Sequence, residues 1–359
     1  MRNKSEINTR SPVIPTSEFS SLSNYRYLCH GFDTINLCLY VQWHDAVELH
    51  RNLQEAKAHA IRKNRPIFWK HSSIGDTLLC DRGSSSYPYH LKNLCFDLYL
   101  NAAAFICNTP NIYVCLRSTS LWRLGLDKSL TLLLQFIKDL KGSVARIQVN
   151  RIDLCCDYHM PNGLTLDFLL SHKVSATRTS SQIMNGDRLG TFYVGSRKSG
   201  CLCRIYNKSA ELKKHNRTFL PHEKADPKYR DDIWRVEFEL RRKSLIQFDI
   251  DTVDELKNKA PGLWQYLTTK WLSFRLPTSN NSTRRPIHPW WADVQSRAGE
   301  FGKPFTLKRN IHKTRCVCDP RWFIAHVAGC LPSMAVLGGT TDLKYLVCSP
   351  KTDPVLVRV

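Results

Sequence analysis

The chain has 359 residues, of which 42% are hydrophobic and 23% are charged. These are globular values, which exclude a disordered or fibrous protein and predict a substantial core. The 52 Lys and Arg against 31 Asp and Glu give a formal net charge of +21, spread along the chain. This excess favours a polyanionic partner, because each cation that meets a phosphate releases a counterion, although a basic protein without such a partner has the same composition.

The cysteines and the apolar runs indicate the compartment. The 14 cysteines stand singly within apolar stretches such as Leu37-Cys38-Leu39, which is typical of buried free thiols rather than of a disulfide framework. The N-terminus has no apolar signal-peptide core, and no stretch approaches the roughly 18 apolar residues of a membrane span. We therefore expect a reducing, cytoplasmic location and no membrane partner.

Hydrophobic periodicity predicts the elements in chain order. After a flexible lead over residues 1–28, we expect a strand at 31–43, a helix at 44–63 and strands at 66–70 and 91–100. A strand at 111–118, a helix at 129–142 and a strand at 145–159 follow. The order then recurs as a helix at 164–172, a hairpin of strands 188–196 and 201–209, and a strand at 233–242.

This recurrence predicts an α+β fold. We expect a largely antiparallel, curved sheet built from two related β-α-β halves with flanking helices. A helix over 253–274 and a Pro, Ser and Arg-rich stretch follow, so the predicted division is a lead (1–28), a catalytic domain (29–275) and a smaller, mainly helical or irregular C-terminal segment (276–359).

Two of the predicted strands carry rows of carboxylates. A period of two places Arg235, Glu237, Glu239 and Arg241 on one face of 233–242, and it places Arg151, Asp153, Cys155 and Asp157 on one face of 145–159. Solvated Glu and Arg pairs would give the same pattern. Carboxylates from two strands that meet would instead require a cation between them, and oxygen ligands favour Mg²⁺ or Mn²⁺.

The strand 201–209 places Arg204, Tyr206 and Lys208 on one face. The flanking cations would favour the phenolate of Tyr206 and bind a phosphodiester, as nucleophilic attack requires. By spacing alone, however, a packing tyrosine beside a solvated lysine fits as well. The preceding turn, GSRKSG, either closes a plain hairpin or presents Arg197 and Lys198 to phosphate.

In this order, the stretches NRIDLCCDY, TFYVGSRKSGCLCRIYNKSAE and IWRVEFELRR resemble the replication initiation factor family, which includes rolling-circle plasmid initiators and related nicking relaxases of mobile elements. The resemblance spans roughly residues 30–295 and is strongest over 150–242. It implies a metal-dependent enzyme that nicks origin DNA by tyrosine attack, leaving a 5′-phosphotyrosyl link and a free 3′-OH for a polymerase.

Carried onto this chain, the resemblance assigns roles to particular residues. The nucleophile is Tyr206, and Lys208 and Arg204 stabilise charge. The ligands of Mg²⁺ or Mn²⁺ are Asp153, Glu237, Glu239 and Asp157, unless a salt bridge to Arg151 or Arg235 takes up one of these carboxylates. Apart from the resemblance, we expect the basic residues Arg197, Lys198, Arg151, Arg235 and Arg241 to contact DNA. Family members often have an acidic residue where this chain has Asn207, whereas the acidic residue after the lysine is present as Glu211, which we expect to start a helix.

The resemblance also implies partners. These are origin DNA, single-stranded or supercoiled, together with a helicase and a polymerase of a bacterial host, and a homodimer is compatible with two nicking events per round. Two alternatives stay open: a non-catalytic nucleic-acid-binding protein that stacks bases on exposed aromatics, and a conjugative relaxase of an integrative element. A relaxase with a His-hydrophobe-His metal motif is disfavoured, since the 13 histidines include no such pair.

Overall fold

The computed structural model describes residues 24–72, 75–84, 86–102, 109–311, 328–333 and 335–336. Contacts divide the chain into two units, Met1–Arg309 and Asn310–Val359. In the second unit, residues 328–333 are helical. Residues 1–23 of the expected lead, and 312–327, 334 and 337–359 of the expected C-terminal segment, lie outside the described residues. Residues 276–309, grouped with that segment by their composition, are in the first unit.

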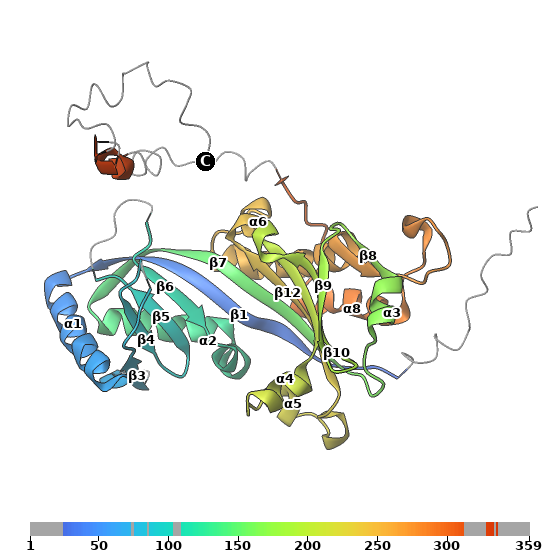
Figure 1. The fold of residues 1–359 in the computed structure, drawn as a ribbon, viewed down its shortest axis with the longest axis horizontal. Helices are drawn as coiled ribbons and strands as arrows, with labels where there is room; N and C mark the ends of the chain where they lie inside the picture. The colour runs from blue at the N-terminus through green and yellow to red at the C-terminus, as the bar shows by residue number, and fades with distance from the viewer. Residues whose placement is uncertain are drawn as a thin grey trace, which may run out of the picture. The chain divides into compact units, whose positions relative to one another are not determined.

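The first unit is built on one antiparallel sheet of eleven strands, in the order β2-β3-β4-β5-β6-β1-β7-β12-β11-β10-β9. Two strands of 18 residues each, β1 and β7, pair along their whole length at its centre (Figure 1). The strands of the sheet are β1 (Arg26–Trp43), β2 (Ile67–Ser72), β3 (Gly75–Leu79), β4 (Tyr89–Lys92), β5 (Phe96–Leu100), β6 (Ile112–Leu116), β7 (Gly142–His159), β9 (Ser180–Asn185), β10 (Arg188–Ser196), β11 (Cys201–Asn207) and β12 (Ile233–Arg241).

The sheet consists of two halves with the same path, as the sequence predicted. Each half starts with a long central strand, continues through a helix, and returns by an antiparallel meander whose last strand pairs with the first. In the N-terminal half the last strand is β6 beside β1, and in the C-terminal half it is β12 beside β7. Strands β8 (Lys173–Ser175) and β13 (Leu272–Phe274) form a separate small sheet.

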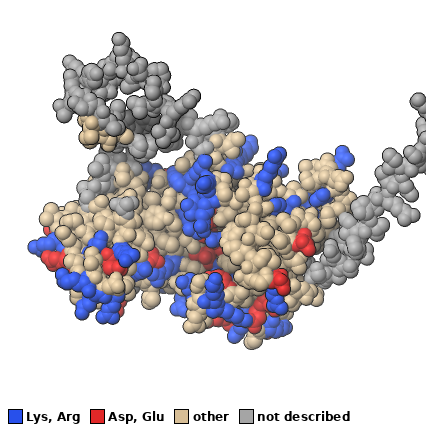
Figure 2. Space-filling view, in the orientation of Figure 1, with Lys and Arg blue, Asp and Glu red and all other residues tan. Residues whose placement is uncertain are grey.

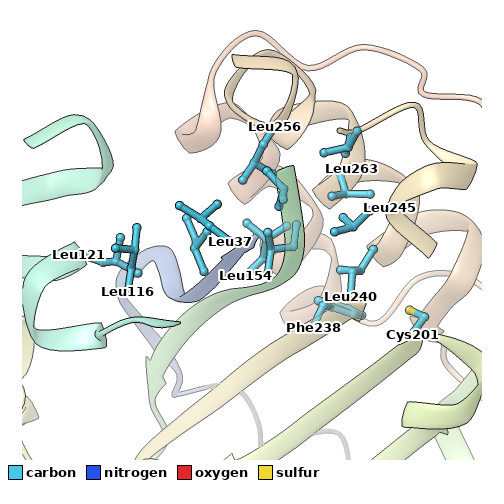
Figure 3. Close-up of a cluster of buried hydrophobic side chains, with 14 of the residues drawn as sticks. Leu37, Leu116, Leu121, Leu154, Cys201, Phe238, Leu240, Leu245, Leu256 and Leu263 are labelled. Carbon is cyan, nitrogen blue, oxygen red and sulfur yellow. The ribbon is translucent and has the colours of Figure 1, made fainter. Parts of the chain in front are cut away.

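Helices cover one face of this sheet. Apolar residues that alternate along the strands, such as Ile35 of β1 and Leu154 of β7, pack against Phe136, Leu263 and Trp290 in one continuous core. Figure 3 shows part of this core, with side chains from both halves of the sheet. The helices are α1 (Ala46–Lys63), α2 (Ser118–Asp139), α3 (Leu166–His172), α4 (Lys208–Lys214), α5 (Leu220–Glu223), α6 (Arg242–Gln247), α7 (Val253–Tyr266) and α8 (Pro289–Ser296).

Local sequence signals explain where several helices start. The side chain of Asp45 accepts a hydrogen bond from the Glu48 amide at the start of α1, and Thr252 and Glu255 form a capping box at the start of α7. Because β11 and β12 are antiparallel, the helices that follow them, α4 and α6, lie at opposite ends of this strand pair (Figure 1).

Several elements differ from the sequence predictions. The first strand begins at Arg26, inside the expected 1–28 lead, and the strand expected over 91–100 is two strands, β4 and β5, joined by a turn at Asn93. The helix expected over 253–274 gives way to a π-helical turn at Leu267–Trp271 and then to β13. Among the described residues, none of the helices has the length and apolar character needed to cross a bilayer.

Leu154→Ala tests the core under the central strands. Leu154 of β7 is fully buried, so its truncation should lower the free energy of unfolding by about 2–5 kcal/mol, measured by urea denaturation. Leu94→Ala is the control, because this leucine is 85% exposed and should change stability by less than about 0.5 kcal/mol. Similar losses in the two variants would contradict the described core.

Candidate active site

Strand β12 lies between β7 and β11, and its register brings the expected site residues together. Asp153 of β7 is directly opposite Glu239 of β12, and Glu237 of β12 is directly opposite Arg204 of β11, two residues before Tyr206. The carboxylates are 1–2% exposed. This face is therefore not a solvent-washed row of Glu and Arg, and its buried charges must be compensated within the protein.

The hydroxyl of Tyr206 donates a hydrogen bond of 2.8 Å to the carboxylate of Glu237. Burial, and then the negative charge of Glu237, raise the pKa of Tyr206 well above its usual value. The expectation that flanking cations favour the phenolate is therefore wrong for this state of the protein. The geometry supplies a proton acceptor instead, because Glu237 already accepts the phenolic hydrogen.

Arg204 lies among three carboxylates. Its Nη2 is 3.1 Å from Asp153 and 3.9 Å from Glu239, and it also hydrogen-bonds to Glu237. Burial nevertheless raises the pKa of Asp153 to about 7, with Glu237 adding to this effect and Arg151 and Arg204 opposing it. Asp153 thus holds a proton more readily than an exposed carboxyl does, despite the two arginines beside it.

Glu239 is held by three further arginines. Arg241, Arg151 and Arg197 lie 2.7, 3.2 and 3.3 Å from its oxygens. Burial alone would raise the pKa of Glu239, but the hydrogen bond from Arg241 and these charges outweigh it and lower the pKa. Arg197 reaches this position from a 3₁₀ turn in which Gly200 has φ +83°, a conformation that favours glycine.

Lys208 is the first residue of α4 rather than a continuation of the strand. Asn207 caps this helix by accepting a hydrogen bond from the Ala210 amide. The ammonium of Lys208 forms an ion pair of 2.7 Å with Glu211 in the first helical turn and lies 5.7 Å from the ring centre of Tyr206. Lys208 is therefore beside the tyrosine, and Glu211 is a helix-start residue as expected.

Asp157 and Arg235, predicted as a metal ligand and a DNA contact, bind one another. The guanidinium of Arg235 donates to the two oxygens of Asp157 at 2.6 and 2.8 Å and to Asp33 at 2.5 Å. Both partners are fully buried, and the pKa of Asp157 stays well below its usual range because Arg235 and His222 outweigh the effect of burial. Arg235 is thus not presented to solvent, and Asp157 is already paired.

Within the described residues, one group of side chains has the convergence typical of a metal site. Ligand atoms of Cys29, Asp157 and His222 all lie within 4.8 Å of one another. Its sulfur and nitrogen atoms are softer than the oxygen ligands that Mg²⁺ or Mn²⁺ prefer. Since Arg235 also occupies both oxygens of Asp157, this group acts in the structure as a buried hydrogen-bonded cluster.

A cavity of about 300 Å³ opens above Tyr206. Asp153, Glu237 and Arg204 line it from the sheet, Lys208 lines it from the start of α4, and Arg217 and Phe219 line it from the segment that joins α4 to α5. The ring of Phe219 lies 4.7 Å from the Arg235 guanidinium and contacts Trp122 of α2 edge-on. The segment is thereby anchored over one end of the site.

A second cavity, of about 320 Å³, adjoins the first through Arg151, which lines both. Its lining is strongly basic, and Figure 2 shows Lys and Arg gathered across the middle of the molecule near α6, with acidic side chains next to them. The residues that line it are Asn36, Tyr113, Asn150, Arg151, Arg197, Lys198, Gly200, Arg241, Arg242 and Lys243.

The site also contains Asp33, His222, Phe219 and Arg217, which no sequence pattern indicated. Asp33 lies in an apolar strand whose register shifts between Phe32 and Thr34, so period-two counting along the sequence does not place it. The other three are in a charged segment without apolar periodicity. Only their docking against β7, β12 and α2 brings them to the site.

Arg235→Met tests the buried charge pair. It removes the guanidinium that binds both carboxylates and leaves Asp157 with His222 and Asp33 with Ser118. We therefore expect the free energy of unfolding near pH 7 to fall by about 3–5 kcal/mol, measured by chemical denaturation. In the wild type the pKa of Asp157 is lowered, so the pair's stabilisation is present above the unfolded pKa of about 3.9 and is lost below it.

The difference between the variant and the wild type should therefore shrink as the pH falls below about 4. Arg146→Met is the control. The Arg146 side chain is 45% exposed and pairs with Asp251 at the surface, so its loss should lower the free energy of unfolding by less than about 1 kcal/mol. A pH-independent loss for Arg235→Met would contradict the assignment.

No family model matches the chain, and no curated protein matches it significantly. Three chains of solved structures do match. One of them is described as a rolling circle replication initiator protein from Geobacillus stearothermophilus, with 13% sequence identity, a TM-score of 0.43, and coverage of 79% of this chain and 100% of that chain. Because this similarity is distant, a function must be argued from the site itself.

Proposed function

We propose that this protein is a rolling-circle replication initiator that nicks origin DNA with Tyr206 as the nucleophile. The observation that carries the proposal is the 2.8 Å hydrogen bond from the Tyr206 hydroxyl to Glu237. Both residues line a cavity that is also lined by Asp153 and by the cations Lys208, Arg204 and Arg217. Tyr206, Arg204 and Lys208 belong to the R-x-Y-x-K motif and Glu237 belongs to the R-x-E-x-E motif, and both motifs lie in the stretches that resemble the replication initiation factor family.

The chemistry follows from these positions. As the Tyr206 oxygen bonds to the scissile phosphorus, its proton passes to Glu237, and the bond from phosphorus to O3′ breaks. The DNA then carries a 5′-phosphotyrosyl link, and the released O3′ takes a proton from solvent to become a 3′-OH. Lys208 and Arg217 line the cavity as cations that bind the phosphodiester and stabilise its developing charge.

The donor set of Asp153, Glu237 and Glu239 fits Mg²⁺ or Mn²⁺, because it consists of carboxylate oxygens from adjacent strands. Arg204 Nη2 now lies among them, while its Nε is buried and has no hydrogen-bond partner in the described part of the chain. When bound, such an ion would polarise a phosphoryl oxygen. Arg151 donates to both oxygens of Asp153, at 2.9 and 2.6 Å, so it would have to give way to such an ion. Asp157 is left out of this set because it is fully buried on Arg235 and does not line the cavity.

Other parts of the proposal follow from the family resemblance and the charge of the chain. Arg151, Arg197, Lys198 and Arg241 line the basic cavity and are proposed to contact the DNA backbone. We also propose that the protein works with a helicase and a polymerase of the host, that it forms a homodimer, and that it acts in the bacterial cytoplasm. The division of the chain into a catalytic domain (29–275) and a C-terminal segment (276–359) is likewise proposed.

Tyr206→Phe tests the nucleophile. The variant should bind origin DNA as the wild type does, yet form no covalent DNA–protein adduct with Mg²⁺ or Mn²⁺, because it lacks the attacking oxygen. Adduct formation is followed by gel electrophoresis, and the linked residue is mapped by peptide mass. The control is Tyr193→Phe, whose ring lies on the same face directly opposite Arg204, and it should cleave normally.

An adduct that maps to another tyrosine would refute the assignment. If the wild type binds DNA but gives no adduct with either metal, the protein is a non-catalytic nucleic-acid-binding protein, which the net charge of +21 also suits.

The pKa of Asp153 predicts how metal binding depends on pH. Since this pKa is raised to about 7, the carboxyl must lose a proton before it can ligate a cation, and Mn²⁺ affinity should rise between pH 6 and pH 8. The measurement is the increase in unfolding temperature caused by Mn²⁺ at each pH.

Asp153→Asn should abolish this increase, because the amide offers the ion no charged ligand. Asp127→Asn, at a carboxylate that is 76% exposed, should leave it unchanged. An equal Mn²⁺ effect at pH 6 and pH 8 would argue against Asp153 as a ligand.

A further inference from the structure

The polar face of the N-terminal half carries aromatic rings in a row across its strands. His90, Tyr99 and Tyr113 lie directly opposite one another on β4, β5 and β6. The rings of His90 and Tyr99 are stacked at 4.0 Å, and those of Tyr99 and Tyr113 are 6.3 Å apart. The alternate residues of the same strands, such as Leu98 and Val114, are fully buried in the core. The row is therefore on the face that the core helices do not cover.

This row is on the same face as the active site. Cys115, two residues after Tyr113, is opposite Asn36 of β1, which is opposite Arg151 of β7. Arg151 in turn is opposite Arg241 of β12. Because directly opposed residues share a face, the aromatic row and the carboxylates look out on one continuous surface.

The basic cavity joins the two regions. Tyr113 lines it together with Arg151, Arg197 and Arg241, and Arg151 also lines the cavity above Tyr206. Strands β6 and β11 are four positions apart in the sheet, which corresponds to about 19 Å at 4.8 Å per strand. A DNA strand that runs from Tyr206 along this path would pass the cations of the basic cavity first and the rings of Tyr113 and Tyr99 next.

The tyrosine rings are held in place but remain partly accessible. Asn36 donates a hydrogen bond of 2.5 Å to the Tyr113 hydroxyl. Beside Tyr99, His90 and Arg117 both contact Asp97, at 3.2 and 2.9 Å. Tyr99 and Tyr113 are themselves half-buried. Fixed aromatic rings next to cations suit unpaired bases, whose phosphates the cations attract and whose faces stack on the rings.

We propose that Tyr99 and Tyr113 form a stacking platform for the unpaired bases of the DNA strand held at Tyr206, with the basic cavity carrying the intervening phosphates. This inference rests on the proposed function, because the choice of DNA as the ligand comes from it. The occupant of the platform is single-stranded DNA, because a duplex keeps its base faces covered and offers the rings nothing to stack on.

The test measures binding without cleavage. The full chain carrying Tyr206→Phe, in EDTA, is titrated by fluorescence anisotropy against a single-stranded oligothymidylate and against a blunt duplex of the same length. Tyr99→Leu and Tyr113→Leu should each weaken single-strand binding by about 5- to 150-fold, the range expected for one stacked base. Duplex binding should be unchanged.

Matched variants separate stacking from fold and from charge. Tyr99→Phe and Tyr113→Phe keep the ring and should bind as the parent does, and so should Tyr229→Leu, which removes a half-buried ring elsewhere. The salt dependence of single-strand affinity should be unchanged in the two Leu variants. In Arg241→Gln the slope of log affinity against log salt concentration should become less steep by about one.

A second measurement does not depend on substitutions. Single-stranded DNA containing 5-iodouracil, irradiated in complex with the parent protein, should cross-link to Tyr99 or Tyr113, as mapped by peptide mass. The proposal is overturned if the Leu and Phe variants bind single strands equally, if the Leu variants lose duplex binding to the same extent, or if cross-links map only elsewhere. Because no cleavage is needed, these outcomes are independent of the adduct at Tyr206.

Discussion

Compensation of buried charge is the constraint on which the rest of this structure depends. Strands β7, β12 and β11 bury three carboxylates, Asp153, Glu237 and Glu239, on the sheet face opposite the core. A buried carboxylate without a partner is too costly to keep, so arginines on the same strands point inward to them. The same rule holds at the next position, where Arg235 binds Asp157. The arrangement also organises the surroundings, because His222 and Phe219 pack onto this pair and fasten the segment between α4 and α5 over one end of the site.

The two faces of the sheet have separate tasks. The face under α2, α7 and α8 holds the apolar core and supplies the stability. The other face carries the charges, the two adjoining cavities and the aromatic row. Pairing between the long strands β1 and β7 joins the halves, so that carboxylates from the C-terminal half and tyrosines from the N-terminal half lie on one surface. In the proposed function, this surface lets one strand of DNA contact the nucleophile, the basic cavity and the aromatic rings.

Tyr206 illustrates how burial changes chemistry. A surface tyrosine between cations would ionise more readily, but this one is hydrogen-bonded to Glu237 and its pKa is raised. Its reactivity in the proposed function therefore comes from proton transfer to a positioned carboxylate rather than from a standing phenolate. The raised pKa of Asp153 has the same origin, since burial disfavours its charged form and repulsion by the Glu237 carboxylate adds to this effect. A cation that binds there would relieve this repulsion.

The sequence alone determined the class of fold, most of its strands and the two faces of β7 and β12, because a strand's side chains alternate with a period of two. This alternation placed Asp153, Glu237 and Glu239 on polar faces, and the short motifs around Tyr206 selected it as the candidate nucleophile. Only the tertiary structure decided which of these groups meet. It paired Arg235 with Asp157, moved Lys208 from a strand to the first turn of α4, and brought Asp33 and His222 to the site. Register between strands far apart in sequence, bulges and the docking of irregular segments depend on packing across the whole sheet, and none of these is encoded in a local period.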